Sequence, residues 1–430
     1  MFGSLGVAFY GQREIAFVQD DVEKRSKIFF QIFFMKLITM LISIVLYFFI
    51  YARNGEYSIY YKILLLEFIA NCLDISWFFQ GMEEFQKTIT RNIIVKILSI
   101  ASIFIFIKTP DDVWKYVAIY GITTFLGNIV LWFGLFKYVK PVKLKDINVF
   151  KHLKPALLMF IPQIAIQIYT VLDKTMIGAI TGDMSQVGYY EQAQKIVKML
   201  LTIITSIGTV MMPRLAKNYI EGNFETIKKY MYKTFKFIYL LAVPLIFGLI
   251  SVSDNFVPLF FGEGYDEVIP LMKIMSLIIL IIGFGNIIGS QYLLATKKQN
   301  QFTISVVCGA IVNVVFNLIL IWKYKAIGAS IATVIAEFSV TSVQFWFIRK
   351  DFKIGKILTF SAKYIIAGLV MFIISLSINN IIKDKLISIC LQVLVGAISY
   401  FILLFILREE LCKEYAAKFM QKIYGILKRK

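Results

Sequence analysis

The chain has 430 residues, of which 59% are hydrophobic, with a mean hydropathy of +0.74 and a net charge of +19. This apolar fraction exceeds the about 45–50% of soluble domains, which excludes a water-soluble globular enzyme and predicts a polytopic membrane protein. Four dispersed cysteines and a single histidine, His152, make a zinc site improbable. The positive charge requires no nucleic-acid partner, because loop lysines account for it in a membrane protein.

Apolar stretches long enough to cross a hydrocarbon core of ~30 Å follow one another along the chain. Twelve are predicted, near 28–50, 59–80, 90–107, 113–137, 154–180, 193–213, 233–253, 268–294, 301–322, 326–348, 358–379 and 387–407. Of the 46 basic residues, 31 fall on the side of both termini and seven on the other side. By the positive-inside rule, both termini are expected in the cytoplasm.

A polar stripe interrupts the apolar stretch 154–180. Gln163, Gln167, Thr170 and Lys174 recur at steps of four, three and four, so they share one helix face, and Asp173 lies beside that face. Charged residues within an apolar helix are costly in hydrocarbon and usually face a bundle interior or a wet cavity. The alternative is a buried ion pair that only fixes helix packing.

Several sequence motifs resemble those of a known transporter family. They are YGQREIA (Tyr10 to Ala16), DISWFFQGMEEF (Asp74 to Phe85), RNIIVK (Arg91 to Lys96), LDKTMIG (Leu172 to Gly178) and VGYYEQAQKIVK (Val187 to Lys198). By these motifs the chain resembles the polysaccharide (O-antigen or capsule) repeat-unit flippases of the multidrug/oligosaccharidyl-lipid/polysaccharide exporter superfamily. The resemblance implies a transporter, not an enzyme. It would move undecaprenyl-pyrophosphate-linked oligosaccharides across the bacterial cytoplasmic membrane by alternating access.

The resemblance also implies an all-α fold of two inverted V-shaped lobes plus two extra C-terminal helices. The expected division is an N-terminal lobe of four helices over 1–140, a C-terminal lobe of six over 141–350, and two additional helices over 351–408. The basic tail 409–430 has apolar residues at every fourth position and is predicted to form an amphipathic helix on the cytoplasmic leaflet.

A weak internal repeat relates the segment from Ser4 to the segment from Ser206. In both, Ser-x-Gly is followed by an arginine, a charged spacer and an apolar helix. One to two of the helices that precede the second copy have no counterpart before the first. The N-terminal lobe is therefore expected to be incomplete, and the fourteen helices of the resembled family imply the same.

Polar residues in the apolar stretches are expected to line a hydrated cavity between the lobes. Hydroxyl and amide groups would meet the sugars, and Lys36, Lys174 and Arg214 would meet the pyrophosphate, although loop anchoring is the default for Arg214. Buried carboxylates can exchange protons or bind sodium, so H⁺ or Na⁺ coupling is expected and no other cofactor. The predicted cavity residues are Lys36, Glu67, Asn71, Asp74, Gln163, Gln167, Thr170, Asp173, Lys174, Arg214 and Glu337.

Other functions remain open on the sequence alone. A multidrug or metabolite cation antiporter and a peptidoglycan-precursor flippase would share the fold. A membrane glycosyltransferase or polymerase would need a sizeable external loop for its catalytic residues, and the predicted outward loops are short. The expected partners are the lipid-linked oligosaccharide, membrane lipids, and the polysaccharide polymerase with its chain-length machinery. The sugar, the coupling ion and the oligomeric state stay open.

Overall fold

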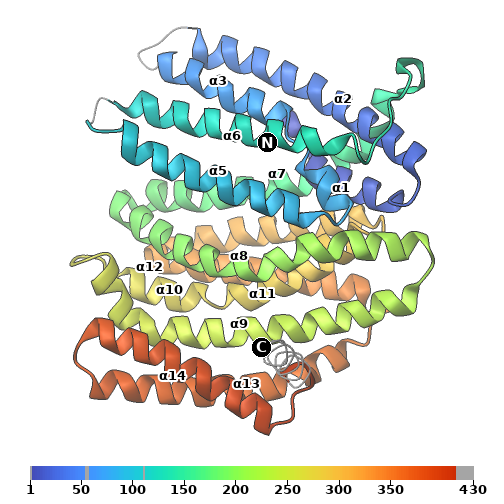
Figure 1. Ribbon diagram of the computed structural model, residues 1–430. Helices are drawn as coiled ribbons and strands as arrows, with labels where there is room; N and C mark the ends of the chain where they lie inside the picture. Colours follow the sequence, from blue (N-terminus) through green and yellow to red (C-terminus); the bar gives the residue numbers. More distant parts are fainter. Residues whose placement is uncertain (1, 54–57, 110–111, 413–430) are drawn as a thin grey trace, which may run out of the picture. The chain divides into compact units, whose positions relative to one another are not determined.

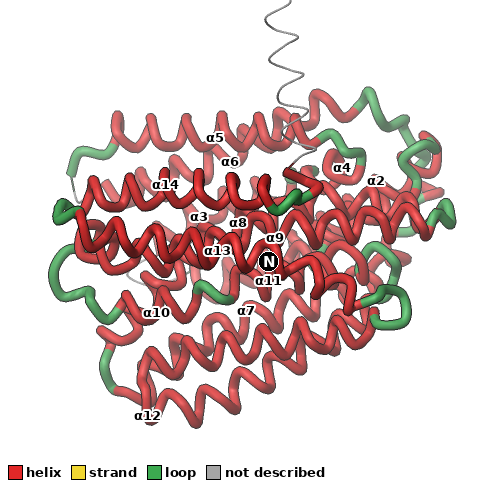
Figure 2. Tube along the Cα trace, turned by 90° about the horizontal axis from the view of Figure 1, so that it is seen from below, coloured by secondary structure: helices red, strands yellow, loops and turns green. Residues whose placement is uncertain are grey.

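A computed structural model describes residues 2–53, 58–109 and 112–412, and within these residues all regular structure is helical (Figures 1 and 2). Eleven of the described helical segments are long and apolar enough to cross a membrane. The α-helices are α1 Val7–Phe17, α2 Val22–Tyr47, α3 Ser58–Cys72, α4 Ser76–Gly81, α5 Phe85–Phe106, α6 Val113–Leu135, α7 Leu153–Thr181, α8 Met184–Ile220, α9 Phe224–Phe260, α10 Val268–Met275, α11 Ile278–Gly285, α12 Gln299–Ile348, α13 Ile354–Ile381 and α14 Lys385–Ile406. Shorter helical turns are η1 Phe2–Ser4, η2 Phe48–Ala52, η4 Leu144–Asp146, η5 Val149–His152 and η6 Asn286–Leu293.

Helix α12 contains two of the predicted spans, 301–322 and 326–348. Its 50 residues would measure ~75 Å if straight, far more than one membrane crossing. The helix is interrupted at Lys325, which has φ 50° and ψ −130°. The chain turns so tightly there that a Cβ on Gly328 would lie 2.2 Å from the Leu320 carbonyl oxygen. Glycine is required at 328, and the predicted pair of spans is confirmed as two passes joined by a turn.

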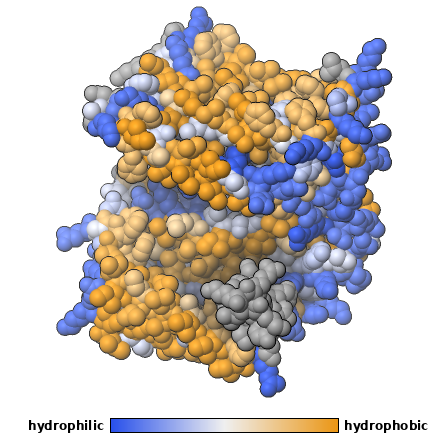
Figure 3. Space-filling model, viewed as in Figure 1, coloured by the Kyte–Doolittle hydropathy of each residue, from blue (hydrophilic) through white to orange (hydrophobic). Residues whose placement is uncertain are grey.

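The sides of the helices carry large apolar side chains in contact with the surroundings. Phe104 of α5, Phe133 of α6 and Trp322 of α12 are 74%, 79% and 82% exposed. In Figure 3 hydrophobic residues cover the flanks of the helices, and hydrophilic residues gather toward the helix ends. Such an apolar surface matches hydrocarbon and not water, so the chain is a multi-pass membrane protein.

The chain divides into two compact units. Unit 1 comprises Met1–Ile164, Thr209–Asn223 and Leu294–Thr303, and unit 2 comprises Ala165–Gly208, Phe224–Leu293 and Ile304–Lys430. Within unit 1, α6 packs against α3 and α5, and α1 packs against α4. Within unit 2, α9 packs against α10, α11, α13 and α14.

Two glycines bring α1 and α4 into close contact. A Cβ on Gly11 would lie 2.4 Å from the Trp77 ring, and a Cβ on Gly81 would lie 2.7 Å from the Gln12 carbonyl oxygen. Trp77 itself is buried, with 2% of its surface exposed. Two of the motifs that carry the family resemblance, YGQREIA and DISWFFQG, therefore pack against each other in the core of unit 1.

The predicted span 59–80 corresponds to the candidate span Ser58–Gly81, but its helix is interrupted at residues 73–75, where α3 has ended and α4 has not yet begun. Two α6 side chains bond carbonyl groups next to this break. Asn128 Nδ2 donates to the Ala70 oxygen at 2.7 Å, and Trp132 Nε1 donates to the Leu73 oxygen at 2.8 Å. Interrupted helices inside a membrane protein need such internal partners, because hydrocarbon offers none.

A proline in α9 leaves a second carbonyl without its helical donor. Pro244 has no N–H to give to the Leu240 carbonyl four residues earlier. The hydroxyl of Tyr400, from α14, donates to that carbonyl at 3.2 Å, and Tyr400 is fully buried. This bond attaches α14 to the point where α9 lacks one of its own backbone hydrogen bonds.

Unit 1 repeats this arrangement with different residues. Pro213 of α8 cannot donate to the Thr209 carbonyl, and Gln12 Nε2 of α1 donates to that oxygen at 2.8 Å. In both units a side chain from another helix thus takes the place of the missing proline N–H.

The predicted amphipathic tail over 409–430 lies mostly outside the described residues. Its beginning is described: Glu409 accepts from the Tyr364 hydroxyl of α13 at 2.7 Å and from the Cys412 backbone N–H at 2.8 Å. Glu409 is 4% exposed. Glu409, the first residue of the predicted tail, is therefore attached to α13 through its buried carboxylate.

Candidate functional site

The most buried of the predicted site residues is Asp173 of α7, with none of its surface exposed. One carboxylate oxygen accepts from Asn317 Nδ2 at 2.6 Å. The other accepts from the Tyr190 hydroxyl at 2.8 Å and from Thr333 Oγ1 at 3.3 Å. The donors come from α8 and from both halves of α12, so the carboxylate is a common acceptor for several helical segments of unit 2.

A second carboxylate lies one turn along the same helices. Glu337 follows Thr333 by one turn of α12, and its Oε1 accepts from the hydroxyl of Tyr169, one turn before Asp173 on α7, at 2.6 Å. Glu337 is 9% exposed. In the part of the chain that the structure describes, neither carboxylate forms a salt bridge. A buried carboxylate without a cationic partner is costly unless it takes up a proton or a cation.

Polar atoms remain beside this pair of carboxylates. Asn317 Nδ2 also donates to Asn313 Oδ1 at 3.1 Å. Among the described groups, Asn317 Oδ1 and Asn313 Nδ2 are buried without a hydrogen-bond partner. Both asparagines are fully buried. The Asp173 cluster, defined as Tyr169, Asp173, Tyr190, Asn313, Asn317, Thr333 and Glu337, is therefore rich in oxygen atoms and incompletely hydrogen-bonded.

The stripe of α7 that sequence analysis singled out lies outside this cluster. Gln163 and Thr170 donate to carbonyls one turn earlier on their own helix, and Gln167 is exposed. Lys174 Nζ lies 3.5 Å from the carboxylate of Glu191 on α8. The structure thus brings Asp173 and Glu337 together and separates the stripe residues from them.

Lys36 and Asp74 meet in unit 1, at the break between α3 and α4. Lys36 of α2 is 3% exposed, and its Nζ donates to the backbone oxygen of Asp74 at 2.7 Å. The Asp74 side chain accepts from the Ser76 N–H at 3.0 Å and lies 3.5 Å from the Arg91 guanidinium. These groups hold the break together. Asp74 lies beyond Cys72, the last residue of α3, and therefore does not share a helix face with Glu67 and Asn71.

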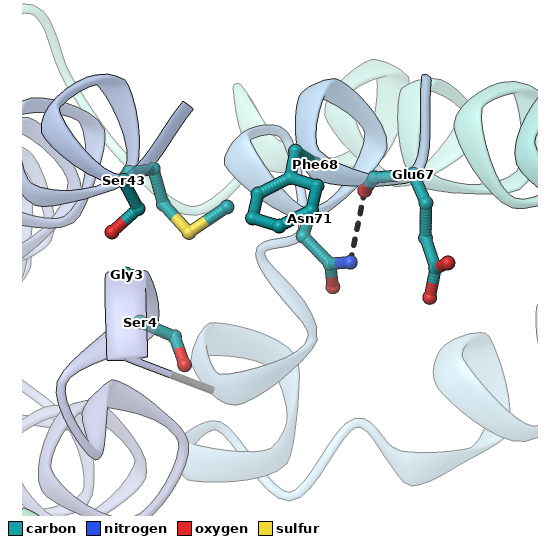
Figure 4. Close-up of a pocket in the computed structure, with 7 residues that line it drawn as sticks. Gly3, Ser4, Ser43, Glu67, Phe68 and Asn71 are labelled. Carbon is teal, nitrogen blue, oxygen red and sulfur yellow. Dashed lines mark hydrogen bonds between the residues drawn. The ribbon is translucent and has the colours of Figure 1, made fainter. Parts of the chain in front are cut away.

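Glu67 and Asn71 line a cavity of about 270 Å³ in unit 1 (Figure 4). Figure 4 shows the Glu67 carboxylate and the Asn71 amide extending to the same side of α3. Asn71 Nδ2 donates to the Glu67 backbone oxygen at 2.9 Å. The complete lining is Gly3, Ser4, Met40, Ser43, Glu67, Phe68 and Asn71.

Arg214 belongs neither to the Asp173 cluster nor to the buried residues around Lys36 and Asp74. Its Nε lies 3.0 Å from the carboxylate of Glu83, and its side chain is 46% exposed. The pair joins the C-terminal part of α8 to the loop between α4 and α5, both in unit 1. This geometry fits the loop-anchoring alternative for Arg214.

Two buried cations of unit 1 were not among the predicted site residues. Arg25 Nε donates to the Tyr138 carbonyl at 3.0 Å and Arg25 NH1 donates to the Gln19 carbonyl at 2.5 Å. Arg13 NH1 donates to the Leu294 carbonyl at 3.2 Å. Arg13 belongs to the YGQREIA motif and to the internal repeat, but neither pattern showed that its side chain is buried, and no sequence signal marked Arg25.

The buried histidine is also part of unit 1. His152 of η5 is 3% exposed and lies between two polar side chains. Its Nδ1 is 2.6 Å from the Tyr10 hydroxyl, and its Nε2 is 2.9 Å from Gln31 Oε1. These bonds attach the segment before α7 to α1 and α2.

Comparison with known proteins places this architecture in a family. A family model described as "Polysaccharide biosynthesis protein" matches residues 1–219, and one named MatE matches residues 159–319. The "Putative O-antigen transporter" of Escherichia coli (strain K12) is 23% identical over 82% of this chain and 85% of its own length.

Solved structures show the same fold. The structure of lipid II flippase MurJ in an inward closed conformation superposes with a TM-score of 0.64 at 20% identity, over 95% of this chain and 90% of that one. A multidrug resistance MATE family transporter of the MOP superfamily, outward-facing, gives 0.68 at 15% identity, over 83% and 84%. By its family match and its fold, the chain belongs to the polysaccharide biosynthesis protein family of the multidrug/oligosaccharidyl-lipid/polysaccharide exporter superfamily.

Proposed function

We propose that the chain is a flippase that moves lipid-linked oligosaccharide repeat units across the bacterial cytoplasmic membrane for surface polysaccharide synthesis. The observation that carries this proposal is the family match over residues 1–219, supported by the similarity to an O-antigen transporter over 82% of the chain. The apolar flanks of both units suit a substrate whose lipid tail stays in the bilayer while its head group crosses. In this proposal both termini are cytoplasmic, as the distribution of basic residues favours.

The proposed transport mechanism is alternating access. Interrupted helices supply points where such a protein can bend, and this chain has them at residues 73–75, at Lys325 and at the helix prolines. The side chains that bond the freed carbonyls, such as Tyr400 and Gln12, would limit how far each helix bends. The released oligosaccharide would pass to a polymerase and its chain-length machinery on the outer side.

We assign ion coupling to the Asp173 cluster. Its carboxylates have no salt bridge within the described residues, and the side chains of Asn317 and Thr333 are within hydrogen-bond distance of Asp173. Na⁺ bound there, or a proton on Asp173 or Glu337, would remove the cost of the buried charge. Ion binding would then favour one arrangement of α7 against α12 over another.

A cation antiporter of the same superfamily is the second candidate, favoured by the MatE family model that matches residues 159–319; a multidrug transporter structure also superposes with a TM-score of 0.68. This likeness, at 15% identity, concerns the fold alone. The two functions differ in substrate, so a direct transport assay distinguishes them.

The deciding experiment reconstitutes the purified chain in liposomes and measures movement of a fluorescent undecaprenyl-pyrophosphate oligosaccharide, with and without a Na⁺ or H⁺ gradient. We expect movement that depends on one of these gradients and that Asp173→Asn abolishes, whereas Asp266→Asn, in an exposed loop, leaves it unchanged. Gradient-driven efflux of ethidium without oligosaccharide movement would replace the flippase with the antiporter. Movement that ignores both gradients would remove the coupling role of Asp173.

A further inference from the structure

The cavity beside α3 combines the chemical groups that recognise a sugar ring. It offers a carboxylate from Glu67, an amide from Asn71 and a hydroxyl from Ser43, next to the aromatic ring of Phe68 and the thioether of Met40. Polar groups at the edge of an apolar wall suit a pyranose, which has hydroxyls on its rim and C–H groups on its faces. At about 270 Å³ the cavity is just below the ~300–1,000 Å³ of sites for drug-sized ligands, so it fits one ring.

The polar groups of this cavity are mainly hydrogen-bond acceptors. Ser43 donates its hydroxyl hydrogen to the Thr39 carbonyl at 2.9 Å, and Asn71 donates an N–H to the Glu67 backbone oxygen at 2.9 Å. The oxygen of each group is thereby left to accept. Glu67 forms no salt bridge among the described residues, and the lining contains no lysine, arginine or histidine. An acceptor-rich, negatively charged cavity favours hydroxyl and amino groups and repels a carboxylate.

The aromatic wall continues beyond the cavity toward the ends of α2 and α3. The Phe68 ring centroid lies 4.7 Å from that of Tyr47, and Tyr47 lies 5.5 Å from Tyr51 and 6.3 Å from Tyr61. The Tyr47 hydroxyl is buried and without a hydrogen-bond partner among the described groups. Tyr47, Tyr51 and Tyr61 are outside the lining of the cavity, and their rings form an aromatic cluster with Phe68.

The depth of the cavity also suits a crossing substrate. Glu67 lies nine residues into α3 from Ser58, which corresponds to ~14 Å, near the middle of a ~30 Å core. Figure 4 shows Ser4, on η1, across the open space from Asn71 and Glu67. A carboxylate at this depth is expensive unless it meets water or a polar ligand.

We propose that the cavity lined by Ser43, Glu67, Phe68 and Asn71 binds one pyranose ring of the transported oligosaccharide, preferring neutral or amino sugars to uronic acids. The identification of the ring as part of a lipid-linked oligosaccharide rests on the proposed function; its recognition by this cavity does not. Glu67 accepts from hydroxyls or an ammonium group, Asn71 and Ser43 accept from neighbouring hydroxyls, and the sugar's C–H face packs on Phe68.

The test uses the full chain in nanodiscs and measures binding of glucosamine, glucose and glucuronate by saturation-transfer NMR with competition. We expect glucosamine to bind at least about tenfold more tightly than glucuronate, which corresponds to about 1.4 kcal/mol. Glu67→Gln, which keeps the size of the side chain, should erase this preference. Asn71→Ala should weaken all sugars alike, and the exposed Glu23→Gln on α2 should change nothing.

Three outcomes would overturn the proposal: no sugar bound by the wild-type chain, glucuronate bound as tightly as glucosamine, or a preference that survives Glu67→Gln. If Glu67→Gln does not fold, as judged by its elution profile and unfolding temperature, Ser43→Ala serves as the second variant, and unchanged binding of all three sugars would then refute the pocket. Failure of oligosaccharide movement in liposomes with sugar binding intact would refute the proposed function and not the pocket.

Discussion

The buried charges within the helices of the two units have opposite signs. Within the helices of unit 1 the charged side chains with the least exposure are Arg13, Arg25 and Lys36, whereas within the helices of unit 2 they are Asp173 and Glu337. The cations donate to backbone carbonyl oxygens, at helix ends or at a helix break. The carboxylates accept from side-chain hydroxyl and amide groups instead.

We infer that the buried cations of unit 1 have a structural role and the buried carboxylates of unit 2 a role in transport. A cation bound to backbone carbonyls stabilises the path of the chain, and its removal leaves carbonyls unsatisfied in a place without water. A carboxylate bound only by side chains can change its charge while the helices stay intact. We therefore expect substitutions of the buried cations to reduce folding, and substitutions of the buried carboxylates to reduce transport.

The largest effect is expected for Arg25→Met. Arg25 donates to the Tyr138 and Gln19 carbonyls, and hydrogen bonds from charged donors contribute about 1.5–3 kcal/mol each. Loss of both should cost about 3 kcal/mol or more and lower the unfolding temperature by about 5–10 °C. The measurement is thermal unfolding of the purified protein in detergent. Lys27→Met, at an exposed site on the same helix, is the control, and an equal loss in both variants would contradict a specific role for Arg25.

The counterpart in unit 2 is Asp173→Asn. Asparagine keeps the size of the side chain and one acceptor oxygen, and the hydroxyls of Tyr190 and Thr333 can accept from its N–H, so the unfolding temperature should stay within a few degrees of the wild type. Transport should fall about 100-fold, equal to about 2.7 kcal/mol, because the amide cannot take up a proton or balance a cation. If the variant unfolds at a much lower temperature but transports normally per folded molecule, then Asp173 is structural, and the proposed difference between the two units is contradicted.

A smaller effect tests a feature that both units share. Tyr400→Phe removes the donor to the Leu240 carbonyl and should cost about 1 kcal/mol. In a Pro244→Ala background, α9 can supply its own N–H to that carbonyl, so the same substitution should cost less. Thermal unfolding of the four proteins of this double-mutant cycle gives the coupling free energy between Tyr400 and Pro244. Equal costs in both backgrounds would show that Tyr400 stabilises α9 through ring packing alone.

The smallest expected effect is an increase in stability. Lys325 adopts φ 50°, a conformation that strains a residue with a Cβ, and Lys325→Gly should raise stability by about 0.5–1 kcal/mol. The matched control is Lys323→Gly, in regular helix two residues away, which should lower stability by about 1 kcal/mol. Opposite shifts in unfolding temperature are the expected outcome, and a loss in both would place the turn elsewhere.

The sequence was sufficient for the spans and for the burial of Asp173 in a helix interior, because long apolar stretches and a charge within them are strong local signals. Sequence patterns fail where residues far apart in the chain determine the local structure. The end of α3 at Cys72 depends on Asn128 and Trp132 of α6, and no pattern near Asp74 revealed it. No local pattern shows that Tyr169 and Tyr190, among the 23 tyrosines in the chain, bond the carboxylates of Glu337 and Asp173.

The α3–α4 break also constrains how this gene can change. The Leu73 and Asp74 carbonyls at the break are each bonded by a side chain of another helix, Trp132 of α6 and Lys36 of α2. A single insertion at residues 73–75 would move at least one of these carbonyls away from its donor and leave it unsatisfied. The loop around Gly262 and Gly264, where a Cβ would meet nothing within 4 Å, is under no such constraint. Length variation among descendants of this chain should therefore accumulate there, and purifying selection should act against it at the break.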